Sequence, residues 1–229
     1  MPPTNLRVGG LARLSTCDWP GQLAAVVFTQ GCSWNCSYCH NPHLLDAGEG
    51  DLPWGDVIAF LETRKGLLDG VVFSGGEPTI QSALADAMSE VRELGFAIGL
   101  HSGGSVPERL AEVLPLVDWV GFDVKAPFAD YVRITGVAGS GERALASLRA
   151  LVASGVEFEA RTTVHPDLLG SDDLEHLSVE LSAEGVTRWA VQAYRAQGAR
   201  SGLRLARFAE ESVPASARER FAEFSFRPA

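Results

Sequence analysis

The sequence contains no long apolar run and no surplus of positive charge. Apolar segments such as AAVVF at residues 24–28 are far shorter than a membrane-spanning helix requires, and the first residues, MPPTNLRVGG, lack the charged and apolar regions of a signal peptide. The formal net charge of −10 repels phosphate backbones, and no lysine and arginine run is interleaved with aromatic residues. We therefore expect a cytoplasmic protein that binds neither membranes nor, broadly, nucleic acid.

Linkers and low-complexity segments are also absent, so the sequence offers no obvious domain boundary. The chain has 229 residues, of which 46% are apolar, and this is enough to bury a sizeable core. We expect a single domain over residues 1–229, with a core at about 22–198 and a helical C-terminal extension at about 199–229.

Helical stretches that stop at a glycine just before an apolar strand recur along the chain. Gly95, Gly155 and Gly185 occupy the position after a helix end, where the backbone needs a positive φ. Alternating helices and strands imply parallel βα units, in either an open doubly wound sheet or a curved, barrel-like sheet. The pattern predicts strands at 24–30, 71–75, 96–101, 117–124, 157–164 and 188–194, and helices at 54–68, 81–94, 106–114, 141–153, 172–184 and 215–223.

Polar and glycine-rich turns follow or end four of the predicted strands. In chain order they are GCSWNCSYC, SGGEP, HSGG and DVKAP. Both candidate architectures place their chemistry in the loops after the strands. We therefore expect the functional site along this rim of the sheet.

Cysteine is scarce, and three of the four cysteines lie within one short segment. Cys32, Cys36 and Cys39 have the spacing C-x3-C-x2-C, which is too short for comfortable disulfides in a reducing cytosol and suits a metal centre. Zinc is one alternative, although His40 adjoins Cys39 and is poorly placed to reach the same ion. Cys17 is another candidate fourth ligand, but we expect it to be a small buried residue. Soft thiolates equally suit an iron–sulfur cluster, and a cluster held by three cysteines leaves one iron open for an exogenous ligand.

Taken together, these motifs resemble those of the radical S-adenosylmethionine (SAM) enzymes. The cysteine segment carries an aromatic residue, Tyr38, before its last cysteine, and the SGGEP turn follows the second predicted strand. More closely, CDWPGQLAAVVFTQGCSWNCSYCHNP, VVFSGGEPTIQ, VGFDVKAP and FEARTTV look like segments of glycyl-radical enzyme activases, in particular the activating proteins of anaerobic ribonucleoside-triphosphate reductase. The resemblance runs from about residue 6 to residue 198, and it implies an α/β fold with a partial (β/α)6 barrel of the radical SAM type.

The resemblance also implies a 4Fe–4S cluster and SAM as cofactors. Cys32, Cys36 and Cys39 would hold the cluster, whose open iron takes the methionyl amine and carboxylate of SAM, and one-electron cleavage would give methionine and a 5′-deoxyadenosyl radical. For every further residue a structural role is the alternative, such as a core aromatic, a tight turn or an ion pair. The residues implied to bind SAM are Tyr38, Asn41, Gly75, Gly76, Glu77, Asp123, Lys125 and Arg161.

The chain departs from the activase pattern after the third predicted strand. Activases usually carry an acid followed by Thr-Asn-Gly there, whereas this chain has HSGG, from His101 to Gly104. An imidazole thus replaces a carboxylate, which removes an anionic contact to a ribose or a cation. His165, Gln192 and Tyr194 end two later strands on the same rim and are further candidates, with a plain surface position as the alternative for His165. No cysteine remains for an auxiliary cluster.

Three functions of different classes stay open. The first is a glycyl-radical activase that acts on a partner enzyme and receives electrons from a low-potential donor such as flavodoxin or ferredoxin. The second is a radical SAM enzyme acting on a small molecule, such as a deazaguanine-forming synthase, and the third is a metal-binding scaffold without catalysis. A scaffold has no need of Gly-Gly-Glu, and the roughly 30 residues after the last predicted strand offer few polar ligands for a small molecule. We expect the first, with anaerobic ribonucleotide reductase as the partner.

Overall fold

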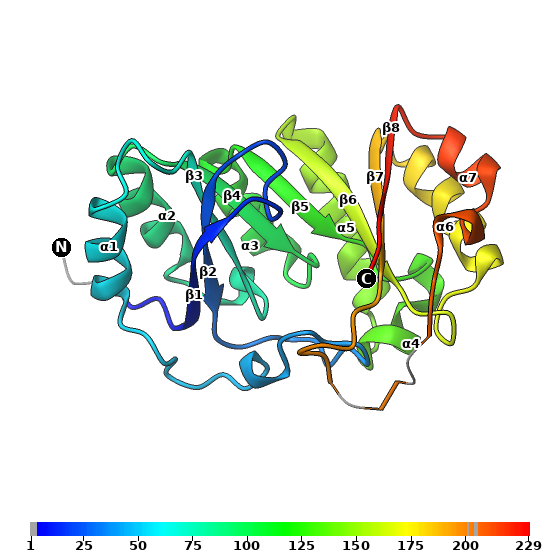
Figure 1. The fold of residues 1–229 in the computed structure, drawn as a ribbon, viewed down its shortest axis with the longest axis horizontal. Helices are drawn as coiled ribbons and strands as arrows, with labels where there is room; N and C mark the ends of the chain where they lie inside the picture. Colours follow the sequence, from blue (N-terminus) through cyan, green and yellow to red (C-terminus); the bar gives the residue numbers. More distant parts are fainter. Residues whose placement is uncertain (1–3, 201, 204–205) are drawn as a thin grey trace.

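The fold is built on one curved, eight-stranded sheet (Figure 1). The computed structural model describes residues 4–200, 202–203 and 206–229. The strands lie across the sheet in chain order; β1 is antiparallel to β2, and every neighbouring pair from β2 to β8 is parallel. The strands are β1 (Val8–Ser15), β2 (Ala24–Thr29), β3 (Gly70–Gly75), β4 (Ala97–Ser102), β5 (Trp119–Asp123), β6 (Glu157–Val164), β7 (Arg188–Ala193) and β8 (Glu223–Arg227).

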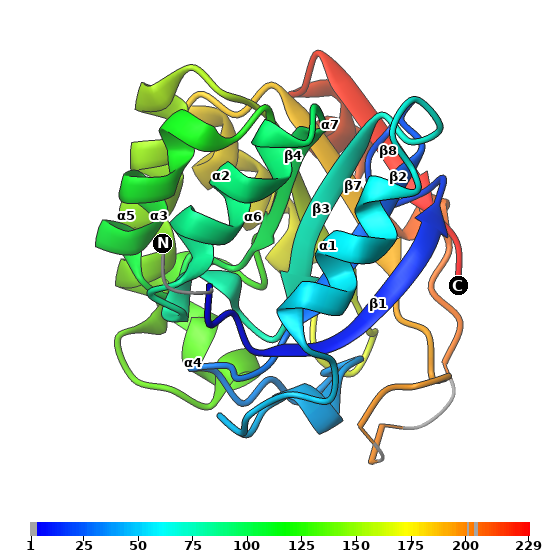
Figure 2. The same ribbon diagram turned by 90° about the vertical axis from the view of Figure 1, so that its left-hand side faces the viewer.

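Helices cover the outer face of the sheet, and loops occupy its concave side (Figures 1 and 2). A strand order that never reverses requires the crossovers to stay on one face, because right-handed connections then always turn the same way. The structure therefore decides for the barrel-like alternative and confirms a partial barrel. The helices are α1 (Trp54–Glu62), α2 (Leu84–Glu93), α3 (Pro107–Val113), α4 (Tyr131–Thr135), α5 (Ser140–Ser154), α6 (Ser171–Ala183) and α7 (Ala215–Glu219).

The two faces of the sheet carry separate hydrophobic clusters. In β2, Ala25 and Val27 belong to the larger cluster, which the helices share, whereas Ala24 and Val26 belong to a smaller one. This alternation follows from strand geometry, in which successive side chains point to opposite faces. The buried residues of the smaller cluster are Trp19, Ala24, Val26, Val72 and Trp119.

Trp19 comes from the β1–β2 loop, residues 16–23, and packs against the strands of the smaller cluster. Its ring stacks on that of Trp119, with centroids 5.7 Å apart and planes 16° from parallel. Gly70 and Gly99 make room for it, since a Cβ atom at either would lie 2.8 or 2.9 Å from the Trp19 ring. The loop thus fills the part of the concave side near the N-terminal ends of the parallel strands. The space near their C-terminal ends remains for the site.

All six predicted strands are confirmed, but two further strands were not predicted. β1 contains Gly9, and a Cβ atom there would lie 2.2 Å from the Leu44 side chain and 2.5 Å from that of Gln30. Glycine is needed for this close packing although it weakens the local strand signal. β8 lies at the opposite edge and pairs with β7 in parallel register.

Two predicted helices extend too far. The helix expected over 54–68 ends at Glu62, because the chain turns through Gly66, whose φ is +74°. The helix expected over 215–223 ends at Glu219, and β8 follows, so the C-terminal extension is not simply helical. Gly95, Gly155 and Gly185 have the predicted positive φ, at 95°, 73° and 87°. In the part of the chain that the structure describes, no helix has the length and apolarity needed to cross a membrane.

Candidate cofactor site

The cysteine loop, residues 30–45, follows β2 and is pinned by neighbours on two sides. The Asn35 and Ser37 amides donate to backbone carbonyls of α4, at 3.0 Å each. On the other side, the Arg200 amide donates to the Cys39 carbonyl at 2.7 Å, and the His40 ring contacts the Arg195 carbonyl at 2.8 Å. The segment after β7 therefore lies against the loop that carries the last cysteine (Figure 1).

The three clustered cysteines line one cavity of about 170 Å³. Burial raises the pKa of Cys32 to about 12 and also raises that of Cys36. A soft cation would supply the charge that stabilises such buried thiolates. No three His, Cys, Asp or Glu side chains in the described ranges converge tightly enough for a single metal ion. A cluster needs less convergence, because each thiolate binds a different iron, so the donor set fits an iron–sulfur cluster.

The SGGEP turn follows β3 and forms another wall of the cavity. Close packing requires glycine at both Gly75 and Gly76. A Cβ atom at Gly75 would lie 2.3 Å from the Thr29 amide nitrogen, and one at Gly76 would lie 2.0 Å from the Gly31 carbonyl oxygen. The Glu77 amide in turn donates to that carbonyl at 2.9 Å. The two glycines thus bring the turn against the start of the cysteine loop, and both line the cavity.

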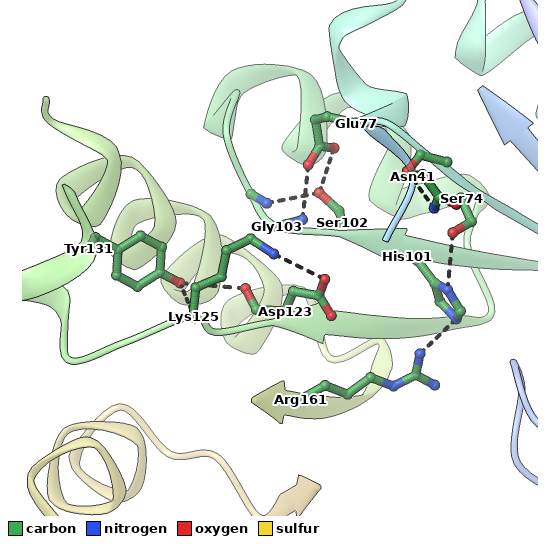
Figure 3. Close-up of polar contacts among 12 residues, drawn as sticks. Asn41, Ser74, Glu77, His101, Ser102, Gly103, Asp123, Lys125, Tyr131 and Arg161 are labelled. Carbon is green, nitrogen blue, oxygen red and sulfur yellow. Dashed lines mark hydrogen bonds and ion pairs between the residues drawn. The ribbon is translucent and has the colours of Figure 1, made fainter. Parts of the chain in front are cut away.

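Glu77 is buried, with 3% of its surface exposed, and its carboxylate is fully engaged by the protein. One oxygen accepts from the Thr79 hydroxyl at 2.7 Å and from the Ser102 hydroxyl at 2.8 Å, and the other accepts from the Gly103 amide at 2.9 Å (Figure 3). Glu77 was expected to contact either SAM or the neighbouring loop, and the structure shows the contact with the loop. A contact with SAM stays a prediction, which its position on the cavity wall allows.

Asp123 and Lys125 form the predicted pair on one face at the end of β5. The Lys125 ammonium lies 3.2 Å from the Asp123 carboxylate and about 6 Å from the rings of Trp34 and Tyr38, at 5.9 and 6.0 Å. Burial alone would lower the pKa of Lys125, but Asp123 and the neighbouring Tyr38 and Cys36 outweigh burial and raise it well above its usual range. The cavity therefore has a fixed positive charge beside the cysteines, which suits an anionic cluster or a carboxylate.

His101 and Arg161 form a polar layer against the Trp119 ring, and His101 also lines the cofactor cavity. Arg161 donates to His101 Nε2 at 2.9 Å, to the Asp18 carbonyl at 3.1 Å and to Glu159 at 3.0 Å. His101 Nε2 also lies 2.8 Å from the Asp18 carbonyl oxygen, which can only accept, and His101 Nδ1 lies 3.3 Å from the Ser74 hydroxyl (Figure 3). Burial first, and then Arg161, lower the pKa of His101 to about 4.

Arg161 therefore forms an ion pair, the structural alternative to cofactor binding, and its partner is Glu159. It lies outside the cofactor cavity, although it lines the cavity beside it. Gly121 leaves the space for its contact with His101, because a Cβ atom there would lie 2.6 Å from the guanidinium carbon. A contact between Arg161 and the SAM carboxylate stays a prediction.

Of the remaining candidates, two line the cavity, and two have a burial that differs from the expected one. Tyr38 and Asn41 line the cavity, and the Asn41 amide donates to the Gly75 carbonyl at 3.4 Å. Cys17 is exposed, so its expected burial is wrong; it lies in a surface turn with Ser15 and Asp18. His165 has none of its surface exposed and packs edge-on against Tyr194, with centroids 5.1 Å apart, so the surface alternative is also wrong.

Sequence reasoning did not single out several residues of the cavity wall. Trp34 lies inside the cysteine motif, and its indole Nε1 has no hydrogen-bond partner among the described residues. Ser102 lies within HSGG, where the sequence signals only a missing acid, yet its hydroxyl holds Glu77. Ser74 and Thr163 are next to last in β3 and β6. The sequence could have indicated them only by their position, as polar residues near the ends of strands.

Comparisons with known proteins agree with the site. Residues 26–178 match the family model described as the radical SAM superfamily. A pyruvate formate-lyase-activating enzyme of Clostridium pasteurianum is 31% identical over 174 residues, which are 73% of this chain and 72% of that protein. A 7-carboxy-7-deazaguanine synthase of Methanopyrus kandleri is 31% identical over 128 residues, 47% of this chain and 51% of that one.

Among solved structures, Streptococcus suis SuiB bound to precursor peptide SuiA shares the fold, with a TM-score of 0.61 and 15% identity over 74% of this chain. This chain spans only 38% of that longer protein. The family match covers the cysteine loop, the SGGEP turn and the Asp123–Lys125 pair, the segments that meet at the cofactor cavity. The chain belongs to the radical SAM superfamily.

Proposed function

We propose that this protein is a glycyl-radical activase that uses a 4Fe–4S cluster and SAM to generate a radical on a glycine of a partner enzyme, most simply anaerobic ribonucleoside-triphosphate reductase. The observation that carries the proposal is the meeting of three cysteines, Gly-Gly-Glu and the Asp123–Lys125 pair in one cavity. The activating enzyme from Clostridium pasteurianum, related over most of both chains, supports this class of substrate.

When bound, the cluster and SAM supply a 5′-deoxyadenosyl radical that abstracts hydrogen from carbon. Cys32, Cys36 and Cys39 would hold the cluster, and Tyr38, Asn41 and the other predicted residues of the wall would position SAM. Lys125 provides positive charge beside the cluster, and Glu77 fixes the SGGEP and HSGG turns against each other. A low-potential donor, flavodoxin or ferredoxin, would deliver the electron in the cytoplasm.

The test combines the anaerobically reconstituted, reduced protein with SAM and each glycyl-radical enzyme of the source organism. We expect a glycine-centred doublet in the electron paramagnetic resonance spectrum of one partner. Cys36→Ala should give none, whereas Arg109→Gln, which changes an exposed ion pair on α3 far from the cavity, should match the wild type. Absence of a doublet with every partner, together with turnover of a small molecule, would favour the deazaguanine-synthase class instead.

A further inference from the structure

A second cavity, of about 290 Å³, adjoins the cofactor cavity and is not used by the mechanism above. The two cavities share His40 and Thr163 in their walls, so they meet at that point. The other residues that matter for the second cavity are Cys17, Asp18, Arg161, Gln192, Arg195 and Arg227.

The second cavity lies between the two ends of the sheet. Cys17 and Asp18 belong to the loop after β1, the first strand, and Arg227 ends β8, the last. Strand register brings the remaining wall together, because Thr163 pairs with Gln192 and Gln192 pairs with Arg227. The cavity therefore opens where the partial barrel fails to close, on the side from which a second molecule can reach the cofactor cavity.

Positive charge dominates the wall of this cavity. Arg161, Arg195 and Arg227 line it, and Asp18 is the one acidic side chain that does within the described ranges. Glu159 is shared, since it accepts from Arg161 at 3.0 Å and from Arg227 at 2.7 Å. Arg195 is exposed, and no ion pair of its side chain occurs among the described residues. In a chain with a net charge of −10, one guanidinium at this cavity thus has no acidic partner among the described residues.

We propose that the second cavity is the substrate-anchoring site and receives a carboxylate carried by a peptide segment of the partner protein. The inference rests on the proposed function, whose substrate segment it describes. Arg195 presents a planar N–H fork, which matches a carboxylate better than any other common peptide group, and Arg227, held by Glu159 and Gln192, adds positive charge beside it. Arg195 is exposed, so the chain on either side of the anchored residue has room to continue into solvent. The junction at His40 and Thr163 leads from the anchor into the cofactor cavity.

Cys17 reports on this site, because it lines the cavity, is exposed and is not among the clustered cysteines. Iodoacetate and iodoacetamide both alkylate the same thiolate, so the ratio of their rates depends on the local potential and not on the thiol pKa. In the cluster-loaded protein with SAM, the ratio is mapped by mass spectrometry at Cys17 and compared between variants, because the Asp18 carboxylate, 3.8 Å from the Cys17 sulfur, lowers its absolute value in all of them. Arg195→Gln should lower the ratio about two- to five-fold. Arg200→Gln, the same charge change on the same segment outside the cavity, should not; equal ratios for both variants would overturn the proposal.

Protection of Cys17 by ligands then identifies the occupant. The probes are acetyl-Ala-Ser-Gly-Glu-Ala-amide, its Gln counterpart and glutarate, each with SAM present. We expect the Glu peptide to protect Cys17 at a concentration several-fold below that of the Gln peptide, and Arg195→Gln to abolish this difference. Equal protection by glutarate would overturn the peptide assignment, and full protection by SAM alone would assign the cavity to the cofactor. Alkylation needs no radical, so a missing glycine doublet alongside selective protection would count against the proposed function alone.

Discussion

At the scale of single residues, the polar side chains of the cofactor cavity are held mainly by other parts of the protein. Glu77 bridges two loops, Asp123 fixes Lys125, and Arg161 fixes His101. Such internal partners lock the side chains before any ligand arrives, which lowers the cost of ordering them on binding. The sequence identified the Asp123–Lys125 pair because their spacing sets their direction, and it identified Glu77 through the SGGEP motif. It did not reveal their partners, since contacts such as Ser102 to Glu77 join separate strands.

The three clustered cysteines should be separable from Cys17 by their effect on iron content. Cys32→Ala, Cys36→Ala and Cys39→Ala should each lose the cluster, whereas Cys17→Ala should keep it, because Cys17 is exposed and does not line the cofactor cavity. After anaerobic reconstitution, iron analysis of the wild type and Cys17→Ala should give about four irons per chain, with charge-transfer absorbance. Stoichiometric zinc without that absorbance would contradict the assignment.

His101 should make the stability of the protein depend on pH below neutrality. Its pKa is lowered to about 4 in the folded state by burial, then by Arg161, against the opposing influence of Asp18 and Asp123. The unfolded chain, with a pKa near 6.5, therefore binds the proton more readily, so stability falls as pH drops from about 6.5 toward 4, by about 3 kcal/mol in total. His101→Gln cannot titrate, and its urea unfolding free energy should fall less over this range. Parallel pH profiles for the two proteins would refute this reading.

At the scale of elements, the β1–β2 loop takes the place that a closed barrel would fill with side chains from its own strands. Trp19 stacks on Trp119 over Gly70 and Gly99, and the Asp18 carbonyl accepts from Arg161. The loop thus helps to hold Arg161 in place and, through Arg161, His101. For this loop the sequence offered a resemblance to activase segments and no structural prediction. A loop that packs through one tryptophan shows no periodic pattern of apolar residues.

Replacing Trp19 should therefore destabilise the whole fold. Trp19 is 8% exposed, and Trp19→Ala should cost about 3–5 kcal/mol, through lost burial and the cavity that remains. Leu14→Ala, at a residue of β1 that is 59% exposed, is the control and should change stability by no more than about 0.5 kcal/mol. The measurement is the free energy of unfolding in urea; similar values for the two variants would show that the loop is not a structural plug.

Elements that repeat a local pattern were predictable, and the two edge strands were not. The six central strands are largely buried, and β4, β6 and β7 follow helices that end at a glycine, so pattern and structure agree there. β1 carries two glycines, and β8 follows a five-residue helix that the same periodicity extended into it. Edge strands depend on what they pack against, which a single sequence does not state. The single-domain organisation of residues 1–229 stays a prediction.

At the scale of the whole molecule, the two edges of the sheet do not pair with each other, and the arginine-lined cavity lies between them. An enzyme that acts on a glycine within another protein needs such a lateral opening, because the reacting carbon belongs to a backbone that continues on both sides. The cofactor cavity, at about 170 Å³, lies behind it and is bounded by the segments of the family motifs. The central claim is therefore that hydrogen passes from a partner's glycine to the radical formed in this cavity.

The most direct test follows that hydrogen atom. The partner enzyme is produced with glycine deuterated at Cα and mixed anaerobically with the reduced, cluster-loaded protein and SAM, and the 5′-deoxyadenosine is analysed by mass spectrometry. The account predicts deuterium in 5′-deoxyadenosine, in proportion to the glycyl radical formed, and none when the partner is unlabelled. 5′-Deoxyadenosine that carries no deuterium in the presence of a labelled partner that acquires a radical would contradict it.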